Sequence, residues 1–425
     1  MTINKRPLGC PSKRQITLCF VTVLIGIGSG CIGMIMALLL KAVQHLSYGL
    51  SPFDVVSHES FLQLVYQASP MRRIMVLTLA GFIAGFGWWA VHRYGKGLVS
   101  IANAVKTNTR MPRWTTIFNG LLQIITIGMG SPLGRERAPR EFGVVCAQWI
   151  SAKAGLSTQD TKIMVACGAG AAFGAIYNVP LAGALYVMEV LVFTMNWTVL
   201  LPAFASSAIA VLISWIGLGN VLQYHVAHEH FSQLLLLWAG LTGPIFGITA
   251  YWFIRLANQA SNAAPTGRKL PIYSMLNYIM IGAFAIYFPA LLGNGKSPVQ
   301  LEFNDAIGLG LSFTLLLLRV LITYTSLRSG SYGGLLTPSL ANGALLGVVL
   351  GGCWDLLWPG IQFKNFAIVG ATAFLAAAQK MPITAIILMF ELMPMKLSFL
   401  MPIMIAVIGS VLCFQLCSKL FDLDK

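Results

Sequence analysis

Stretches of apolar residues recur along almost the whole chain, and they constrain the fold more than any other feature. With 57% hydrophobic and only 10% charged residues, the chain cannot be a soluble globular protein, in which about 25% of residues are charged. We therefore expect an all-α polytopic membrane protein. The apolar runs fall at about residues 16–42, 72–93, 115–129, 142–152, 163–176, 181–195, 198–219, 232–256, 274–293, 307–325, 333–352, 366–378, 382–393 and 397–417.

Several of these runs are too short to cross a bilayer, which takes about 20 apolar residues in a helix. Short runs interrupted by Gly and Pro are typical of transporter helices that end part-way through the membrane, with their termini aimed at a central site. We expect short, broken and tilted helices of this kind. Because the runs continue from residue 16 to residue 417, we expect residues 1–425 to form a single integral membrane transport domain without a soluble regulatory domain.

The net charge of +15 comes from Lys and Arg that lie mostly in short gaps between the apolar runs. This placement is typical of membrane topology and headgroup contact, so we expect a lipid bilayer and no nucleic acid as partner. Lys5, Arg6, Lys13 and Arg14 precede the first run, which is too long for a signal peptide. We expect a multi-pass protein of the cell inner (plasma) membrane with a cytoplasmic N-terminus.

The cysteines and histidines do not form a recognisable ligand set. The eight cysteines are scattered in apolar surroundings without a CxxC pair, which favours small core residues over ligands or disulfides. His225, His228 and His230 are close in sequence, but they lack matching cysteines or carboxylates, which favours a solvated loop over a metal site. The chain also lacks HExxH and paired acid and base residues. We therefore predict no metal, no cofactor and no enzymatic activity.

Two pairs of segments resemble each other at an offset of about two hundred residues. Gly168–Glu189 and Gly370–Glu391 share the spacing of Gly, Pro and Glu, while Gly130–Gly143 and Gly330–Gly343 share a Gly-Ser pair and two further Gly. Chance matching of small residues is the alternative explanation. We predict a duplication whose halves meet at a transport site. The predicted repeats cover about residues 16–219 and 232–417.

The segment Gly130–Gly143, GSPLGRERAPREFG, carries three Arg, two Glu and two Pro directly after an apolar run. A charge in hydrocarbon costs roughly 2–4 kcal/mol or more, so this segment is expected to line a polar cavity inside the protein. A helix beginning near Arg137 or Ala138 would aim free backbone N–H groups and its positive dipole end at the preceding residues. We predict an anion-binding site that includes Gly134 and Arg137.

The second half offers a similar helix start at Gly334, Leu335, Leu336 and Thr337, followed by Pro338. Pro suits the first position of a helix and Thr suits the N-cap, where its hydroxyl could also donate to an ion. Two such termini meeting within the membrane would hold a dehydrated halide without a full cationic side chain. We predict that these four residues bind the anion.

Glu136 is the strongest candidate for coupling protons to anion movement. A carboxylate beside an anion site competes with the anion for it, and protonation frees the site, so proton and anion exclude one another. The alternative is that Glu136 pairs with Arg135 or Arg137 at a membrane surface. Glu189 and Glu391, each surrounded by apolar residues, are either structural or part of a proton route, because a buried carboxylate needs a partner.

These motifs resemble those of the CLC family of chloride channels and anion/proton exchangers. Residues 134–138, GRERA, are similar to the family's GREGP with Glu136 at the gating glutamate, and residues 334–338, GLLTP, are similar to GxFxP. The stretch around Asn178, Pro180 and Gly183, ending at Glu189, is similar to AAFNAPLAG…E. The resemblance covers about residues 72–410 and implies a duplicated inverted repeat, a homodimer with one pore per subunit, and halide transport.

The chain also departs from the family pattern. Lys96 stands at the place of the serine in GSGIP, which makes it a candidate anion contact, and Val190 replaces an inner proton-transfer glutamate. No Tyr follows Tyr332 that could replace the pore-lining tyrosine of the family's last helix.

These departures, with Thr337 added, resemble the bacterial branch that exchanges fluoride for protons. Fluoride holds water strongly, so its site needs close, strong donors. We therefore expect halide/proton antiport with fluoride, or chloride, as the anion. The alternatives are a chloride channel or chloride/proton exchanger and, more remotely, a cation-coupled solute symporter.

Overall fold

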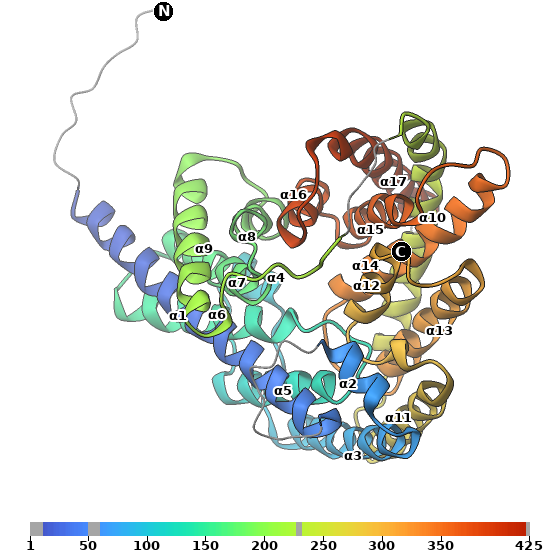
Figure 1. The fold of residues 1–425 in the computed structure, drawn as a ribbon. Coiled ribbons are helices and arrows are strands. Elements are labelled where there is room, and N and C mark those ends of the chain that lie inside the picture. The colour runs from blue at the N-terminus through green and yellow to red at the C-terminus, as the bar shows by residue number, and fades with distance from the viewer. Residues whose placement is uncertain (1–11, 50–59, 227–231, 422–425) are drawn as a thin grey trace, which may run out of the picture.

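The structure, a computed structural model, describes residues 12–49, 60–226 and 232–421, and within them all repeating secondary structure is helical (Figure 1). Eight of these helices are long and apolar enough to cross a membrane. The prediction of an all-α polytopic membrane protein with short and broken helices is confirmed. The first half contains α1 (Lys13–Tyr48), α2 (Phe61–Gln67), α3 (Pro70–Tyr94), α4 (Ile101–Thr107), α5 (Arg113–Gly128), α6 (Arg137–Lys153), α7 (Thr158–Tyr177), α8 (Pro180–Tyr186), the π-helix η1 (Val187–Val192) and α9 (Trp197–Leu218).

The second half repeats much of this order. It contains α10 (Leu234–Asn262), α11 (Leu270–Tyr287), the 3-10 helix η2 (Pro289–Leu291), α12 (Lys296–Phe303), α13 (Leu309–Arg328), α14 (Leu336–Asp355), α15 (Phe363–Gln379), α16 (Pro382–Leu392), the 3-10 helix η3 (Leu397–Phe399) and α17 (Leu400–Phe421). The apolar runs did not indicate α2, α4 and α12, because these helices have only seven or eight residues and mixed polarity.

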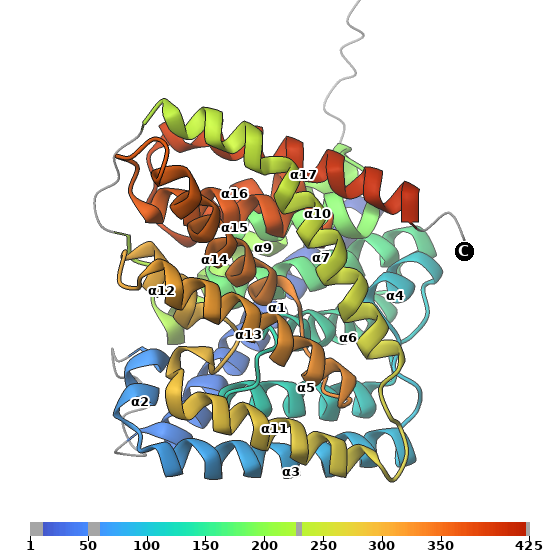
Figure 2. The ribbon, with the colours of Figure 1, turned by 90° about the vertical axis from the view of Figure 1, so that its right-hand side faces the viewer.

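The centre of the molecule is formed by α7 and α15, which are buried along nearly their whole length (Figure 2). α6 packs against α7, and α14 packs against α15, through small residues. A Cβ at Gly143 would meet the backbone of Gly168, and a Cβ at Gly343 would meet the backbone of Gly370. Glycine is required at these contacts because the helix backbones approach each other so closely.

The two central helices end in the same way. α7 is terminated by Asn178 in the left-handed conformation (φ 62°), and α15 by Lys380 (φ 54°). Two residues later, Pro180 and Pro382 occupy the first turns of α8 and α16. A left-handed residue ends a helix and Pro favours the start of the next, so the matched sequence segments adopt matched local structures.

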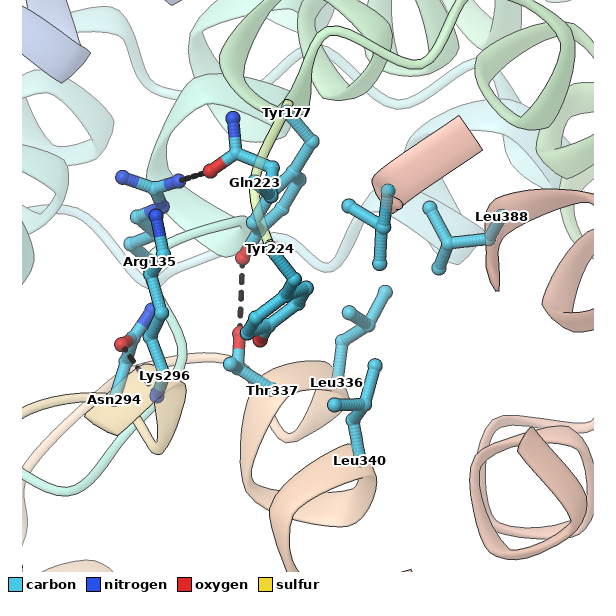
Figure 3. Close-up of a pocket in the computed structure, with 11 residues that line it drawn as sticks. Arg135, Tyr177, Gln223, Tyr224, Asn294, Lys296, Leu336, Thr337, Leu340 and Leu388 are labelled. Atoms are coloured by element: carbon cyan, nitrogen blue, oxygen red, sulfur yellow. Dashed lines mark hydrogen bonds between the residues drawn. The ribbon is translucent and has the colours of Figure 1, made fainter. Parts of the chain in front are cut away.

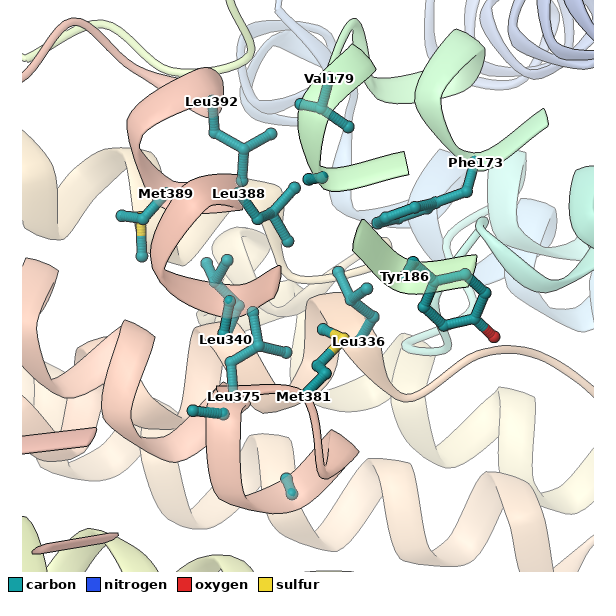
Figure 4. Close-up of a cluster of buried hydrophobic side chains, with 14 of the residues drawn as sticks. Phe173, Val179, Tyr186, Leu336, Leu340, Leu375, Met381, Leu388, Met389 and Leu392 are labelled. Carbon is teal, nitrogen blue, oxygen red and sulfur yellow. The ribbon is translucent and has the colours of Figure 1, made fainter. Parts of the chain in front are cut away.

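An apolar cluster closes the space between the short helices α8 and α16 and the start of α14 (Figure 4). Leu336 and Leu340 on α14 lie in it together with Leu388 and Leu392 on α16 and Val179 beside α8. These side chains are buried. The first turn of α14 is therefore held against the second half's own short helix, which fixes the direction of its free N–H groups.

A buried arginine ties the two halves together near the middle of the fold. Arg319 on α13 donates to the carbonyl oxygens of Leu291 (3.0 Å), Gly293 (2.8 Å) and Pro132 (3.2 Å). The amide of Gly293 in turn donates to the carbonyl of Gly130 at 3.0 Å. Arg319 thus joins a loop of the second half to the residues that precede the predicted anion site in the first.

Replacing Arg319 with Met should destabilise the protein by roughly 3 kcal/mol or more, because three buried carbonyls lose a charged donor. The apparent unfolding temperature of the purified protein in detergent measures this loss. Arg255→Met is the control, since Arg255 is exposed near the end of α10 and lies against the ring of Trp252. Equal unfolding temperatures for the two variants would contradict the structural role of Arg319.

Candidate anion-binding site

Two glycines from the two halves form one antiparallel backbone pair. The amide of Gly134 donates to the carbonyl of Gly334 (2.7 Å), and the amide of Gly334 donates back to Gly134 (2.8 Å). α6 begins three residues after Gly134 and α14 begins two residues after Gly334. The pair therefore brings two helix N-termini, two hundred residues apart in sequence, to one place.

The carboxylate of Glu136 lies at the N-terminus of α14 and is fully buried. Its Oε1 accepts from the backbone N–H of Leu336 at 2.9 Å. Its Oε2 accepts from the hydroxyl of Tyr177 at 3.1 Å and lies 3.4 Å from the hydroxyl of Thr337. The two hydroxyls are 2.9 Å apart (Figure 3). The side chain of Glu136 thus occupies the kind of position that a bound anion takes at a helix start.

Both bridging glycines leave room for this carboxylate. A Cβ at Gly134 or at Gly334 would overlap the carboxylate of Glu136. The two glycines are therefore required by the close approach of the side chain as well as by the backbone pair.

One arginine balances the charge of Glu136. The Nη2 of Arg140 lies 4.0 Å from the carboxylate Oε1, and its Nε donates to the carbonyl of Glu136 at 3.0 Å. Its Nη1 donates to the hydroxyl of Tyr186 at 2.9 Å. Because these partners hold the guanidinium, Arg140 supplies positive potential to the pocket and does not reach into it.

The helix starts agree only in part with the sequence. α6 begins at Arg137, as predicted. The prediction of Thr337 as N-cap and Pro338 as first helical residue was wrong, because α14 already begins at Leu336 with Leu335 as N-cap. The pairing of Gly334 ends the extended segment, so the helix starts directly after it. Thr337 lies in the first turn, and its hydroxyl still faces Glu136.

Two of the residues predicted to bind the anion, Arg137 and Lys96, make no side-chain contact with the carboxylate of Glu136 in the described part of the chain. The guanidinium of Arg137 pairs with Glu141 at 2.8 Å and covers the ring of Tyr332. Lys96 has an exposed side chain, and its backbone N–H donates to the hydroxyl of Thr115 at 3.1 Å. Only the backbone of Arg137, at the start of α6, remains near the site. The structure thus separates the side chains of Lys96 and Arg137 from Glu136.

Glu189 and Glu391 each accept hydrogen bonds from the other half. Glu189 accepts from the backbone N–H groups of Ile383 (2.9 Å) and Thr384 (2.7 Å) at the start of α16. Glu391 accepts from Leu181 (2.8 Å) and Ala182 (2.7 Å) at the start of α8. Helix N-termini stabilise carboxylates, so this exchange gives both residues structural partners. Their part in a proton route stays a prediction.

Sequence reasoning missed Tyr177, although it recorded the lack of a tyrosine after Tyr332. Tyr177 is the last residue of α7, a helix whose C-terminal half is rich in Gly and Ala, and its hydroxyl joins Glu136 to Thr337. A lone large polar ring at the end of such a helix is a usable signal. The contact itself depends on the end of α7 lying beside the start of α14, and the sequence pattern does not show which helices are neighbours.

The predicted absence of a metal site concerns residues that the structure describes only in part. His225 is described, and its backbone N–H and carbonyl bond to the side chain of Gln300. His228 and His230 lie outside the described residues. Across residues 12–49, 60–226 and 232–421, no group of three or more His, Cys, Asp or Glu is placed to hold a metal.

The family model described as voltage gated chloride channel matches residues 75–415, which is most of the chain. The chain belongs to this CLC family. It is 27% identical over 426 residues to the H(+)/Cl(-) exchange transporter ClcA of Vibrio cholerae, covering 95% of this chain and 87% of the relative. It is 29% identical over 352 residues to a putative chloride channel protein ClcB-like of Ralstonia nicotianae, covering 79% and 81%.

Solved structures of CLC proteins share the fold. A slow cyanobacterial Cl-/H+ antiporter superposes with a TM-score of 0.81 at 18% identity, covering 95% of both chains. A CLC-type fluoride/proton antiporter gives a TM-score of 0.66 at 18% identity, covering 96% of this chain and 99% of the other. At this identity, the likeness shows the CLC architecture and says nothing about which anion is bound.

Gly334→Ala should expel the carboxylate of Glu136 from the start of α14, because the added methyl group takes its place. A crystal structure of the variant should show the carboxylate turned away from the N–H of Leu336. Gly310→Ala is the control, since a Cβ there meets open space in α13. A carboxylate that stays within hydrogen-bond distance of Leu336 in Gly334→Ala would contradict the tight fit.

Proposed function

We propose that this chain exchanges a halide for protons across a membrane and that Glu136 is the protonatable gate. One observation carries the proposal: the buried carboxylate of Glu136 takes the N–H of Leu336 and the hydroxyls of Tyr177 and Thr337 as donors. Membership of the CLC family and the exchangers and channels named among its relatives support the same activity.

The chemistry follows from competition for these donors. A charged carboxylate binds strongly to N–H and O–H groups, and a halide would use the same groups. Protonation removes the charge of Glu136 and weakens its hold, so the side chain can leave and the anion can enter. When Glu136 loses its proton, it returns and displaces the anion. Anion and proton therefore alternate at one site, which is the requirement for exchange.

The donors at the gate suit a reversible site. Leu336 contributes a backbone dipole, and Tyr177 and Thr337 contribute neutral hydroxyls. The nearest cation, Arg140, stays 4.0 Å from Oε1 and is held by Tyr186. An anion bound by neutral donors is stabilised without forming a tight ion pair that would slow its release.

Two halides are candidates for the cargo. The relatives named above are a chloride exchanger and a chloride channel, which supports chloride. The hydroxyl pair of Tyr177 and Thr337 beside a backbone N–H supports fluoride, because a strongly hydrated ion needs short, strong donors in place of its water.

The proposal extends to the setting of the protein. We propose a homodimer in the inner (plasma) membrane with a cytoplasmic N-terminus, because Lys and Arg cluster before the first apolar run and the CLC resemblance implies a dimer. We also propose that the chain is a transporter and not an enzyme, acting without a cofactor.

Replacing Glu136 with Gln should abolish proton movement that is driven by a halide gradient, since the amide of Gln is not protonated at physiological pH. Halide flux should either become passive or stop. Proteoliposomes with a pH dye and a halide electrode measure both fluxes together. Glu302→Gln is the control, because Glu302 is also buried but lies on α12. Normal proton coupling in Glu136→Gln would overturn the gate.

Thr337→Val keeps the shape of the side chain and removes its hydroxyl. If fluoride is the cargo, the ratio of fluoride to chloride efflux should fall roughly threefold or more, the effect of one hydrogen bond. Thr372→Val is the control, since the buried hydroxyl of Thr372 bonds to the carbonyl of Ile368 in its own helix. An unchanged ratio would remove Thr337 as a ligand, and wild-type flux of chloride alone would exclude fluoride.

A further inference from the structure

Glu141 is a buried carboxylate near the start of α6 that the exchange at Glu136 does not use. Its residue is 4% exposed. Its Oε1 accepts from the Nε of Arg137 at 2.8 Å. Its Oε2 accepts from the side-chain amides of Asn119 (3.2 Å) and Gln123 (3.3 Å) on α5. Of these three donors, Arg137 alone is charged, so Glu141 serves above all as its counter-ion.

Two further contacts fix the position of this ion pair. The side-chain oxygen of Asn119 accepts from the indole N–H of Trp88 on α3 at 3.0 Å. The ring of Trp88 lies 5.8 Å from that of Tyr332, and the guanidinium of Arg137 lies 5.4 Å from the centre of the same tyrosine ring. Arg137, Glu141, Asn119, Trp88 and Tyr332 therefore form a closed ring of contacts. Within this ring the guanidinium is held by a carboxylate and an aromatic face, and neither belongs to the gate.

The charge balance around the gate gives Glu141 a role beyond packing. Residues 130–143 carry three Arg and two Glu. When Glu136 is protonated, Glu141 is the only negative charge left in this segment. Arg137 follows Glu136 directly in the sequence, so its charge acts on the gate unless it is balanced nearby. The ion pair with Glu141 supplies that balance.

We propose that Glu141 is a positioning residue for the gate, which neutralises Arg137 and holds its guanidinium against Tyr332 so that Glu136 can take up a proton. The proposal rests on the proposed function, since it assigns Glu141 to the proton-dependent step. Without the charge of Glu141, the positive charge of Arg137 would stabilise the ionised carboxylate of Glu136 and oppose its protonation. The gate would then open only in a more acidic medium.

The pH dependence of exchange tests this charge balance in proteoliposomes. Glu141→Gln should move the pH of half-maximal halide-coupled proton flux about one unit lower, the size expected for one unbalanced charge at roughly 10 Å. Arg137→Gln should move it higher, because Glu141 is then the unbalanced charge. The double variant should return close to the wild-type value. Cancelled charges explain such a restoration, whereas a loss of packing does not.

Asp160→Asn is the matched control and should leave the pH of half-maximal flux unchanged. Asp160 is also a buried carboxylate paired with an arginine, Arg14 at 2.6 Å, but it lies at the start of α7. His92, whose Nε2 lies 3.4 Å from the hydroxyl of Tyr332, is the same in all these variants. The other charged or titratable groups around the gate in the described part of the chain are also unchanged: Arg135, Arg140, Lys41, Lys296, Tyr177 and Tyr224.

Infrared titration gives the same comparison without transport. The C=O band of protonated Glu136 is identified by its loss in Glu136→Gln, and its midpoint is followed against pH. An unchanged midpoint in Glu141→Gln, or a double variant that stays shifted, overturns the proposal. If Glu141→Gln does not fold, Arg137→Gln decides alone, and the absence of an upward shift overturns it. Wild-type vesicles that fail to exchange protons with halide would instead refute the proposed function, while the infrared midpoints would still decide whether Glu141 balances Arg137.

Discussion

The rest of the site depends on the backbone pair between Gly134 and Gly334. Two hydrogen bonds of 2.7 and 2.8 Å join segments that lie on opposite halves of the chain, and each segment leads directly into a helix. Because Glu136 is the N-cap residue of α6 and Leu336 begins α14, the pair also sets the distance between the carboxylate and its N–H donor. The buried Arg319 joins the loop that leads into Gly134 to the loop at Gly293, so the geometry of the gate depends on residues well outside it.

The buried charges of Glu136 and Arg319 have partners that the fold supplies from elsewhere. Glu136 uses donors of α7 and α14, and Arg319 uses three carbonyl oxygens of loops. Glu189 and Glu391 use the helix starts of opposite halves. A buried charge that loses its partner costs several kcal/mol, so these contacts restrict how far the two halves can separate. We therefore attribute opening of the gate to movement of the Glu136 side chain and not to a separation of the two halves of the chain.

The sequence predicted those features that depend on neighbours along the chain. Glycine, proline and charge within residues 130–143 predicted the start of α6 and the position of Glu136 in a polar interior. The start of α14 was misjudged by two residues, since local preferences of Thr337 and Pro338 compete with the pairing of Gly334, which comes from the other half. Tyr177 and Lys96 show the same limit: the first enters the site and the second stays outside, and both outcomes depend on how distant helices cross.

Cations and neutral donors are separated in space, and this separation has a physical basis. At the gate, where the ion loses its water, the donors are a backbone N–H and two hydroxyls. Lys41, Arg135 and Lys296 line a neighbouring cavity of about 120 Å³, and none of the three forms an ion pair with Glu136 in the described part of the chain. A full positive charge at the narrow point would hold both the anion and the carboxylate of Glu136 too firmly for either to leave. Because the nearby cations do not donate directly to the carboxylate of Glu136, their positive potential still favours an anion over a cation. The exchange between carboxylate and halide then stays nearly balanced in free energy.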